Sequence, residues 1–225
     1  MISTSQTSHL DSIDSFLAME VFAKAQALEA QGRDIIHLEF GEPDYPAPTA
    51  AVQSVKKSRE INDAGYTFSQ GLEELRIEIA KKYATDYGVK ILPEQGLVSN
   101  GSSLLLYLAI RILAPPGSQV ILTDPCYACY ENVVRLAGAE PVMIKLRHED
   151  GFQLNVDDLK KRVTPKTRAM LINSPMNPTG VVFSSEVMTA LAELDIPVIS
   201  DEIYADLSFE DPPCSFLSYS PQTVA

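Results

Sequence analysis

The first third of the chain shows mainly the spacing of amphipathic helices. Apolar residues recur at intervals of three and four over residues 15–31, 49–60 and 72–87. This period matches the α-helix, so we predict three helices before residue 90. One short apolar run, residues 34–40, interrupts the series and predicts a strand.

From residue 96 to residue 201 the pattern changes to short apolar runs that alternate with helical stretches. The runs are residues 96–99, 120–123, 140–146, 169–172 and 197–199. The helical stretch 102–113 is apolar almost all round, which predicts a buried helix. Strands that alternate with helices form a mainly parallel sheet with helices on both faces. We therefore predict an α/β fold for this part of the chain.

Polar residues follow the last two apolar runs. Asn177 lies in the turn-like stretch Asn-Pro-Thr-Gly, and Asp201 and Tyr204 follow the run at 197–199. In open α/β sheets, ligands bind at the rim formed by the carboxyl ends of parallel strands. An amide, a hydroxyl and a buried carboxylate could hold an aromatic heterocycle with a phenolate and a basic nitrogen, which the carboxylate would keep protonated. The alternative is an ordinary strand–helix–strand crossover with a proline-rich loop.

A second candidate site lies at the start of the apolar helix. Gly101, Ser102 and Ser103 stand at its N-terminus, where free backbone N–H groups and the helix dipole favour a phosphate. The alternative is plain capping of the helix by Asn100 or Ser102. The glycines do not follow the G-x-G-x-x-G pattern, so a dinucleotide site has no support.

Composition narrows the class of protein. The chain has 225 residues, 45% of them hydrophobic, and a formal net charge of −12. The acidic balance argues against nucleic acid and anionic membranes as partners. No apolar run is long enough to span a bilayer. The polar N-terminus lacks the features of a signal peptide, so we expect a cytoplasmic protein.

Two of the three cysteines, Cys126 and Cys129, form a C-x-x-C motif. A zinc site would need two further ligands, and the three histidines are scattered along the chain. A redox motif would be expected at a helix start after the first strand of a small domain. We therefore expect no metal site and interpret the pair as two partly buried thiols near a ligand pocket.

The stretch "NSPMNPTG" followed by "SDEIYADL" resembles the cofactor site of the fold-type I pyridoxal-phosphate enzymes, in particular the class I/II aminotransferases. The resemblance extends over nearly the whole chain. It implies that Asn177 and Tyr204 bond the phenolic oxygen of pyridoxal 5′-phosphate. It also implies that Asp201 pairs with the pyridine nitrogen and makes the ring an electron sink. The start of the apolar helix resembles the phosphate cradle of the family.

The resemblance assigns three more residues. Tyr127, in the spacing "DPxYxxY", would stack on the cofactor ring, with Tyr130 as a rival for that role and a core tyrosine as the alternative. Tyr66 would reach across a dimer interface to the phosphate of the other subunit, which makes the active unit a homodimer; otherwise it is a strand end entering a helix. Gly41 would lie near the substrate carboxylate, unless residues 41–48 are a simple linker.

The resemblance also implies a domain organisation. Residues 1–45 would form an N-terminal helical arm that belongs to the small domain of the family. Residues 46–225 would form the large domain that binds pyridoxal phosphate, and they would stop before that domain is complete. The predicted sheet would then be an incomplete version of the large-domain sheet of type I transferases.

One expected residue is missing. The family needs a lysine that forms a Schiff base with the cofactor, about one strand–helix unit beyond Asp201, but residues 202–225 contain no lysine and no arginine. Six earlier lysines fall in amphipathic helices, where we expect them to face solvent: Lys56, Lys57, Lys81, Lys82, Lys160 and Lys161. We therefore expect the N-terminal part of a longer aminotransferase, with no catalytic residue in this chain and no activity of the chain alone. The alternative is a short natural relative that has lost catalysis.

For the parent enzyme the resemblance implies ping-pong transfer of an amino group between an amino acid and a 2-oxo acid, within amino acid metabolism. Another reaction on the same scaffold, such as a carbon–sulfur β-lyase, is an alternative. A non-catalytic binding or regulatory protein of the same fold is a third interpretation. Regulators of that kind carry a basic DNA-binding segment, and the acidic N-terminus shows none.

Overall fold

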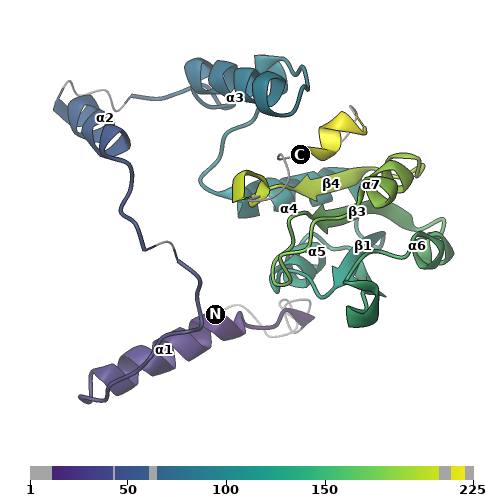
Figure 1. The fold of residues 1–225 in the computed structure, drawn as a ribbon, viewed down its shortest axis with the longest axis horizontal. Helices are drawn as coiled ribbons and strands as arrows, with labels where there is room; N and C mark the ends of the chain where they lie inside the picture. The colour runs from purple at the N-terminus through teal and green to yellow at the C-terminus, as the bar shows by residue number, and fades with distance from the viewer. Residues whose placement is uncertain (1–11, 43, 61–64, 208–213, 221–225) are drawn as a thin grey trace, which may run out of the picture. The chain divides into compact units, whose positions relative to one another are not determined.

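Figure 1 shows the computed structural model, which describes residues 12–42, 44–60, 65–207 and 214–220. The chain divides into two compact units. The sheet unit comprises Met1–Asp14 and Gln70–Ala225, and the N-terminal unit comprises Ser15–Ser69. The domain boundary that we predict between residues 45 and 46 concerns the family's two domains and stays a prediction.

The sheet unit is built on four parallel strands in the order β2-β1-β3-β4. The strands are β1 (Gln119–Asp124), β2 (Glu140–Lys145), β3 (Thr167–Asn173) and β4 (Val198–Asp201). Their short, buried apolar runs are the composition that parallel strands need, because both faces of such a sheet are covered. The predicted α/β fold with a mainly parallel sheet is confirmed.

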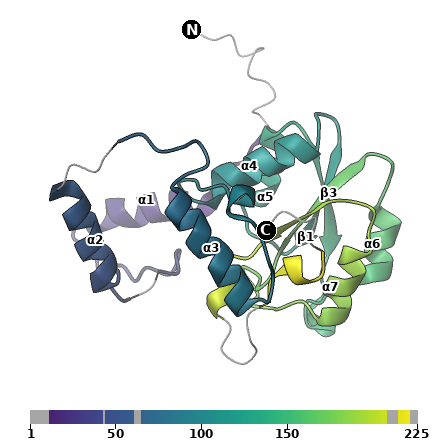
Figure 2. The same ribbon diagram turned by 90° about the horizontal axis from the view of Figure 1, so that it is seen from above.

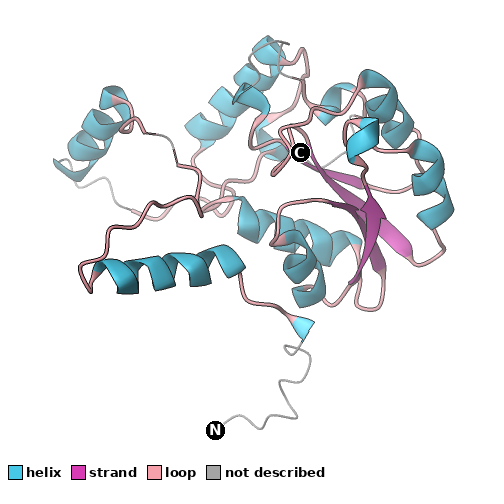
Figure 3. Cartoon of the chain, turned by 60° about the horizontal axis from the view of Figure 1, so that its bottom comes forward, coloured by secondary structure: helices cyan, strands magenta, loops and turns pink. Residues whose placement is uncertain are grey.

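Helices cover both faces of this sheet. Helices α4 (Ser102–Leu113) and α5 (Tyr130–Leu136) pack on one face, where Leu171 and Ile199 point. Helices α6 (Val156–Arg162) and α7 (Ser185–Ala192) pack on the other face, with Met170, Ile172 and Val198. Figures 2 and 3 show the strands between these two helical layers. Alternate residues of each strand therefore serve two separate cores.

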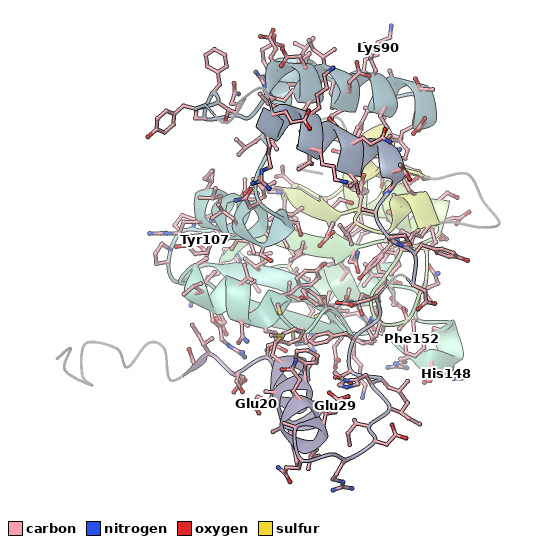
Figure 4. The ribbon with its side chains drawn as sticks, turned by 90° about the vertical axis from the view of Figure 1, so that its left-hand side faces the viewer. Glu20, Glu29, Lys90, Tyr107, His148 and Phe152 are labelled. Carbon is pink, nitrogen blue, oxygen red and sulfur yellow. The ribbon has the colours of Figure 1, made fainter. Side chains whose placement is uncertain are left out.

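Two helices of the sheet unit begin with the caps that their sequences provide. The Asn155 side chain accepts hydrogen bonds from the N–H groups of the first turn of α6. Ser184 accepts from the N–H of Val187 at the start of α7. Between β2 and α6, the exposed ring of His148 packs edge-to-face on Phe152 at 5.7 Å (Figure 4).

Helix α3 (Glu73–Asp86) belongs to the sheet unit through polar contacts. The Arg76 guanidinium donates to the carbonyl oxygen of Pro93 at 3.0 Å. Lys82 pairs with Asp86 on its own helix and with Asp206, which follows β4, at 2.9 Å. The ion pair with Asp206 ties α3 to the segment that carries the end of β4.

Three expectations from the pattern are wrong. Residues 96–99 and 34–40 are not strands. A strand needs a neighbour to pair with, and Val98 makes only a single backbone hydrogen bond, to Gln70, among those described. Helix α4 is also not buried all round, since Leu104, Leu108 and Ile112 are exposed. Only its opposite side meets the sheet, and nothing in the described part of the chain covers this stripe.

The described residues of the N-terminal unit form two helices and extended connections. Helices α1 (Leu17–Glu29) and α2 (Thr49–Glu60) lie where the pattern predicts them. The ring of Phe40 meets Phe22 edge-to-face, with 5.5 Å between their centroids. His37 bonds Glu29 at 3.0 Å and Glu39 at 2.6 Å. No helix among the described residues of either unit is long and apolar enough to cross a membrane.

Candidate functional site

The candidate site lies at the carboxyl ends of β3 and β4, which end at paired residues. Asn173 and Asp201 are partners in the register of the two strands. The Asn173 amide donates to the backbone carbonyl of Asp201 at 2.9 Å, and its side-chain oxygen accepts from the N–H of Asn177 at 2.7 Å. Asn173 is 3% exposed, so this buried side chain ties the loop after β3 to the end of β4.

The loop after β3 places the side-chain amide of Asn177 next to the hydroxyl of Tyr204. The peptide bonds before Pro175 and Pro178 are cis. The side-chain nitrogen of Asn177 lies 3.3 Å from the hydroxyl oxygen of Tyr204, within hydrogen-bond distance. Both side chains are partly buried. The structure thus brings together two groups that lie 27 residues apart in the sequence.

The carboxylate of Asp201 is held at both oxygens. Oδ2 accepts a hydrogen bond of 2.8 Å from the hydroxyl of Tyr130, and Oδ1 accepts one of 3.2 Å from the backbone N–H of Ile203. Burying a carboxylate is costly unless it is hydrogen-bonded, and these two donors offset that cost. Burial and then the charge of Asp201 raise the pKa of Tyr130 well above its usual range.

The two tyrosines of "DPxYxxY" have different surroundings. Their rings meet edge-to-face at 5.5 Å. Tyr130 is 2% exposed and its hydroxyl is bonded to Asp201, whereas Tyr127 is only partly buried. A hydrogen bond with Cys129 and then burial raise the pKa of Tyr127 to about 12. Of the two, Tyr127 is therefore the one with ring surface left for a ligand.

The cysteines beside Tyr127 are free thiols. Burial raises the pKa of the Cys126 thiol to about 12. The thiolate is the form that binds metals and attacks disulfides, so a thiol with this pKa suits neither role at neutral pH. Both thiols are partly buried, as interpreted from the sequence, and their position near a ligand pocket stays a prediction.

Helix α4 begins without a side-chain cap. Gly101 is the N-cap residue with φ +83°, and no side chain of the described residues is found to cap the first turn. No hydrogen bond from Asn100 or Ser102 that would cap the helix is found among the described residues, so the alternative of plain capping gains no support. Such a positive φ favours glycine. Exposed Ser102 and Ser103 follow it, and the amides of this turn are the groups that bind anions at helix starts.

A cavity of about 250 Å³ joins the helix start to the strand end. Ser102 and Asp201 both line it, and the rest of its wall is mainly apolar. The other lining residues are Tyr83, Leu105, Leu106, Ala109, Ile199, Ser200, Glu202 and Ile203. One concave, largely apolar space with a few polar groups is the usual form of a small-molecule site.

Gly41 and Tyr66 belong to the N-terminal unit. Both are exposed there, and Tyr66 is fully so. Their assigned roles, at the substrate carboxylate and at the phosphate of a second subunit, stay predictions.

The sequence analysis assigns no role to Glu202, which the structure shows to be a partly buried acid beside Asp201. Its Oε1 accepts from the N–H of Phe216 at 2.7 Å and from the hydroxyls of Ser200 and Ser215 at 3.0 and 3.2 Å. Its Oε2 is buried with no hydrogen-bond partner among the described residues. Burial raises the pKa of Glu202. A glutamate next to an aspartate at the end of an apolar run was the available signal.

Comparison with known proteins identifies the class. The family model of aminotransferase class I and II matches residues 33–224. The chain therefore belongs to this family, as the sequence motifs predict.

Individual relatives agree with this assignment. A (5-formylfuran-3-yl)methyl phosphate transaminase of Methanocaldococcus jannaschii is 39% identical over 198 residues, which are 88% of this chain and 51% of that protein. The aspartate aminotransferase of Bacillus subtilis is 36% identical over 195 residues, 85% of this chain and 50% of that protein. The solved aspartate aminotransferase of Thermus thermophilus with maleate has a TM-score of 0.93 at 31% identity, covering 100% of this chain and 59% of that one. The chain spans about half the length of the curated relatives it matches.

Proposed function

We propose that this chain forms the cofactor-binding part of a pyridoxal-phosphate-dependent aminotransferase that exchanges an amino group between an amino acid and a 2-oxo acid. The proposal rests on the pairing of Asn177 with Tyr204. These two residues lie on the same rim of the sheet as Asp201, whose two carboxylate oxygens each accept a hydrogen bond. Membership of the aminotransferase class I and II family supports it.

The polar groups of the site fit this cofactor. The carboxylate of Asp201 suits the protonated ring nitrogen, and the Asn177 amide and Tyr204 hydroxyl suit the phenolic oxygen. The uncapped first turn of α4, with Ser102, suits the phosphate. Ser102 and Asp201 line the same cavity, whereas Asn177 and Tyr204 are not among its lining residues. The cavity therefore supports the pairing of the phosphate end with the carboxylate end of the site only.

Three further contacts complete the proposed cofactor site. Gly101 and Ser103 flank Ser102 in the phosphate cradle. The partly exposed ring of Tyr127 would lie against the cofactor ring, where stacking adds about 1 kcal/mol beyond area burial. Tyr66 of the partner subunit would bind the phosphate, which makes the active unit a homodimer. Gly41 would lie near the carboxylate of the amino acid substrate.

The residues of this chain would act mainly by binding and by placing charge. Pyridoxal phosphate, when bound, supplies an electron sink for reactions at the carbon that carries the amino group. Asp201 would hold the proton on the ring nitrogen, because an opposite charge favours the charged form. Asn177 and Tyr204 would fix the phenolic oxygen and so orient the ring. Tyr127 would keep water from one of its faces.

We expect the 225-residue chain alone to lack transaminase activity. The lysines whose ion pairs the structure shows bond surface carboxylates: Lys81 with Glu78, Lys82 with Asp86 and Asp206, and Lys161 with Asp158. A lysine that attaches the cofactor has to reach the rim that carries Asp201. These three lysines instead form ion pairs with surface carboxylates.

Titration with pyridoxal phosphate tests the proposal. Absorbance would follow binding, and borohydride treatment with intact mass would detect a covalent link to a lysine. We expect a weak complex that borohydride does not trap. Asp201→Asn should weaken it at least tenfold, and the exposed acid Asp195→Asn should not. Equal binding by the wild type and Asp201→Asn would contradict the site, and a trapped adduct on one lysine would contradict the expected inactivity.

A further inference from the structure

Tyr130 reaches the candidate site from the core of the sheet unit. It is the first residue of α5, it is 2% exposed, and its ring packs with the core residues between the sheet and helices α4 and α5. The ring of Tyr127 contacts it edge-to-face at 5.5 Å. A buried tyrosine normally finds a partner for its hydroxyl. Here the partner is Asp201, which lies 71 residues further along the chain.

The two donors to Asp201 differ in what they can fix. The N–H of Ile203 belongs to the second residue after Asp201, and such local bonds form in many turns that contain aspartate. Ile203 is itself exposed. The hydroxyl of Tyr130 is the donor that links the carboxylate to the core, and at 2.8 Å it is the shorter bond. Without it, one local bond would leave the carboxylate free to turn towards water.

We propose that Tyr130 is a positioning residue that holds the carboxylate of Asp201 in the orientation needed to pair with a protonated ring nitrogen. This inference rests on the proposed function. Tyr130 would not contact the cofactor nitrogen; it would act through Asp201. The same sequence motif thus supplies two tyrosines with separate tasks, Tyr127 for the face of the ring and Tyr130 for the carboxylate at its edge.

The surroundings of Tyr130 support a donor role. Burial and the neighbouring charge of Asp201 raise its pKa, so its hydroxyl keeps its proton across the neutral range. A protonated phenol donates to a carboxylate, whereas a phenolate would repel it. The ring is fixed by its packing, so the hydroxyl has little freedom to leave Asp201.

The test compares two ligands that differ only at the ring nitrogen: pyridoxal phosphate and its analogue with carbon at that position. Both retain the phosphate and the phenolic oxygen, so the ratio of their dissociation constants reports the pairing with Asp201. We expect the wild-type chain to prefer pyridoxal phosphate. Tyr130→Phe, which keeps the ring, should reduce this preference by roughly fivefold or more, corresponding to about 1 kcal/mol.

Two further variants make the test specific. Tyr107→Phe removes a hydroxyl from α4 (Figure 4) and should leave the preference unchanged. In an Asp201→Asn background, adding Tyr130→Phe should have no further effect on the preference, because Tyr130 acts through that carboxylate. The thermal midpoint of each variant shows whether the fold is retained.

The other outcomes separate this inference from the proposed function. Equal losses of affinity for both ligands in Tyr130→Phe would make Tyr130 merely structural and overturn the inference. A preference that rises in Tyr130→Phe would overturn it as well, because Tyr130 would then compete with the ring nitrogen. A wild type that binds both ligands equally, or neither, would instead overturn the role of Asp201 in the proposed function, and the inference with it.

Discussion

The two units of this chain differ in what their apolar residues contact. In the sheet unit, strands β1 and β3 are almost wholly buried, and residues from four helices cover both faces. In the N-terminal unit, Ala25 is the single buried apolar residue among those described. Helix α2 has no buried residue at all. Both units nevertheless contain helices where the sequence pattern predicts them.

The difference teaches that periodicity predicts a helix but not what covers it. A short helix gains most of its stability from packing of its apolar face. In the N-terminal unit that face is exposed, as the side chains of Leu17, Val21 and Val55 show. In the sheet unit, strands that are far apart in the sequence pack against the apolar faces of the helices. In this chain, apolar helix residues are therefore buried mainly where the helices pack on the sheet.

The largest effect should come from truncating a side chain in the sheet. Ile121 in β1 is 0% exposed, and Ile121→Ala should cost about 3–4 kcal/mol of the free energy of unfolding, from lost burial and the cavity left behind. Val55→Ala in α2, where the side chain is 63% exposed, should change it by less than about 0.5 kcal/mol. Urea unfolding of the two variants measures both, and similar losses would contradict the contrast between the units.

Glu202 should come second, because its Oε1 accepts three hydrogen bonds beside β4. Glu202→Ala leaves these buried donors without an acceptor and should cost about 2–3 kcal/mol in the same measurement. The exposed Glu193→Ala provides the control, with little expected change. A loss for Glu202→Ala no larger than for the control would show that the segment around Phe216 is held by packing alone.

The pH dependence of stability should also depend on Glu202. Burial raises its folded-state pKa above the ordinary 4.5, so the folded chain holds this proton more tightly than the unfolded chain does. Its contribution should therefore fall as the pH rises from about 4.5 through the raised pKa, and then level off. Glu202→Gln should remove this slope. Unfolding curves for both proteins between pH 4 and 8 give the comparison, and parallel profiles would refute it.

Removing a helix cap should have a smaller effect. Asn155 accepts hydrogen bonds from the N–H groups of Asp157 and Asp158 at the start of α6. Asn155→Ala should cost about 1 kcal/mol, and Asn155→Asp, which keeps an accepting oxygen, should cost much less. Helix α1 has no such side-chain cap. Equal stability of the two variants would mean that packing on the sheet, and not the cap, holds the helix.

The smallest effect should come from the polar cluster of the N-terminal unit. Hydrogen bonds to Glu39 and then Glu29 raise the pKa of His37 above 6.5. Any stability from these bonds is present below the unfolded pKa and is lost as the pH rises through the folded pKa. Glu39→Gln should lower the NMR titration midpoint of His37 and leave the unfolding midpoint of the sheet unit unchanged. An unshifted midpoint would show that the bonds do not persist in solution.

The sequence predicted the sheet and the convergence of Asn177, Tyr204 and Asp201, because strand ends and turn residues are local signals. It did not predict that residues 96–99 lack a strand partner among the described residues, since pairing depends on distant segments. It also placed Tyr130 only as a rival for stacking. The bond to Asp201 spans 71 positions, and no spacing rule encodes it. Contacts of this length depend on how α5 packs on the sheet.

The matched ends of β3 and β4 have a consequence for how this region can vary. Asn173 and Asp201 are aligned by strand pairing, so the 27 residues between them do not set the distance across the rim. Insertions beside the exposed Asp195, in the turn at 193–197, should be tolerated because they lengthen a connection outside the strands. Deleting one residue inside β4 would turn Asp201 to the opposite face of the sheet. The geometry of the rim is thus insensitive to loop length and acutely sensitive to strand length.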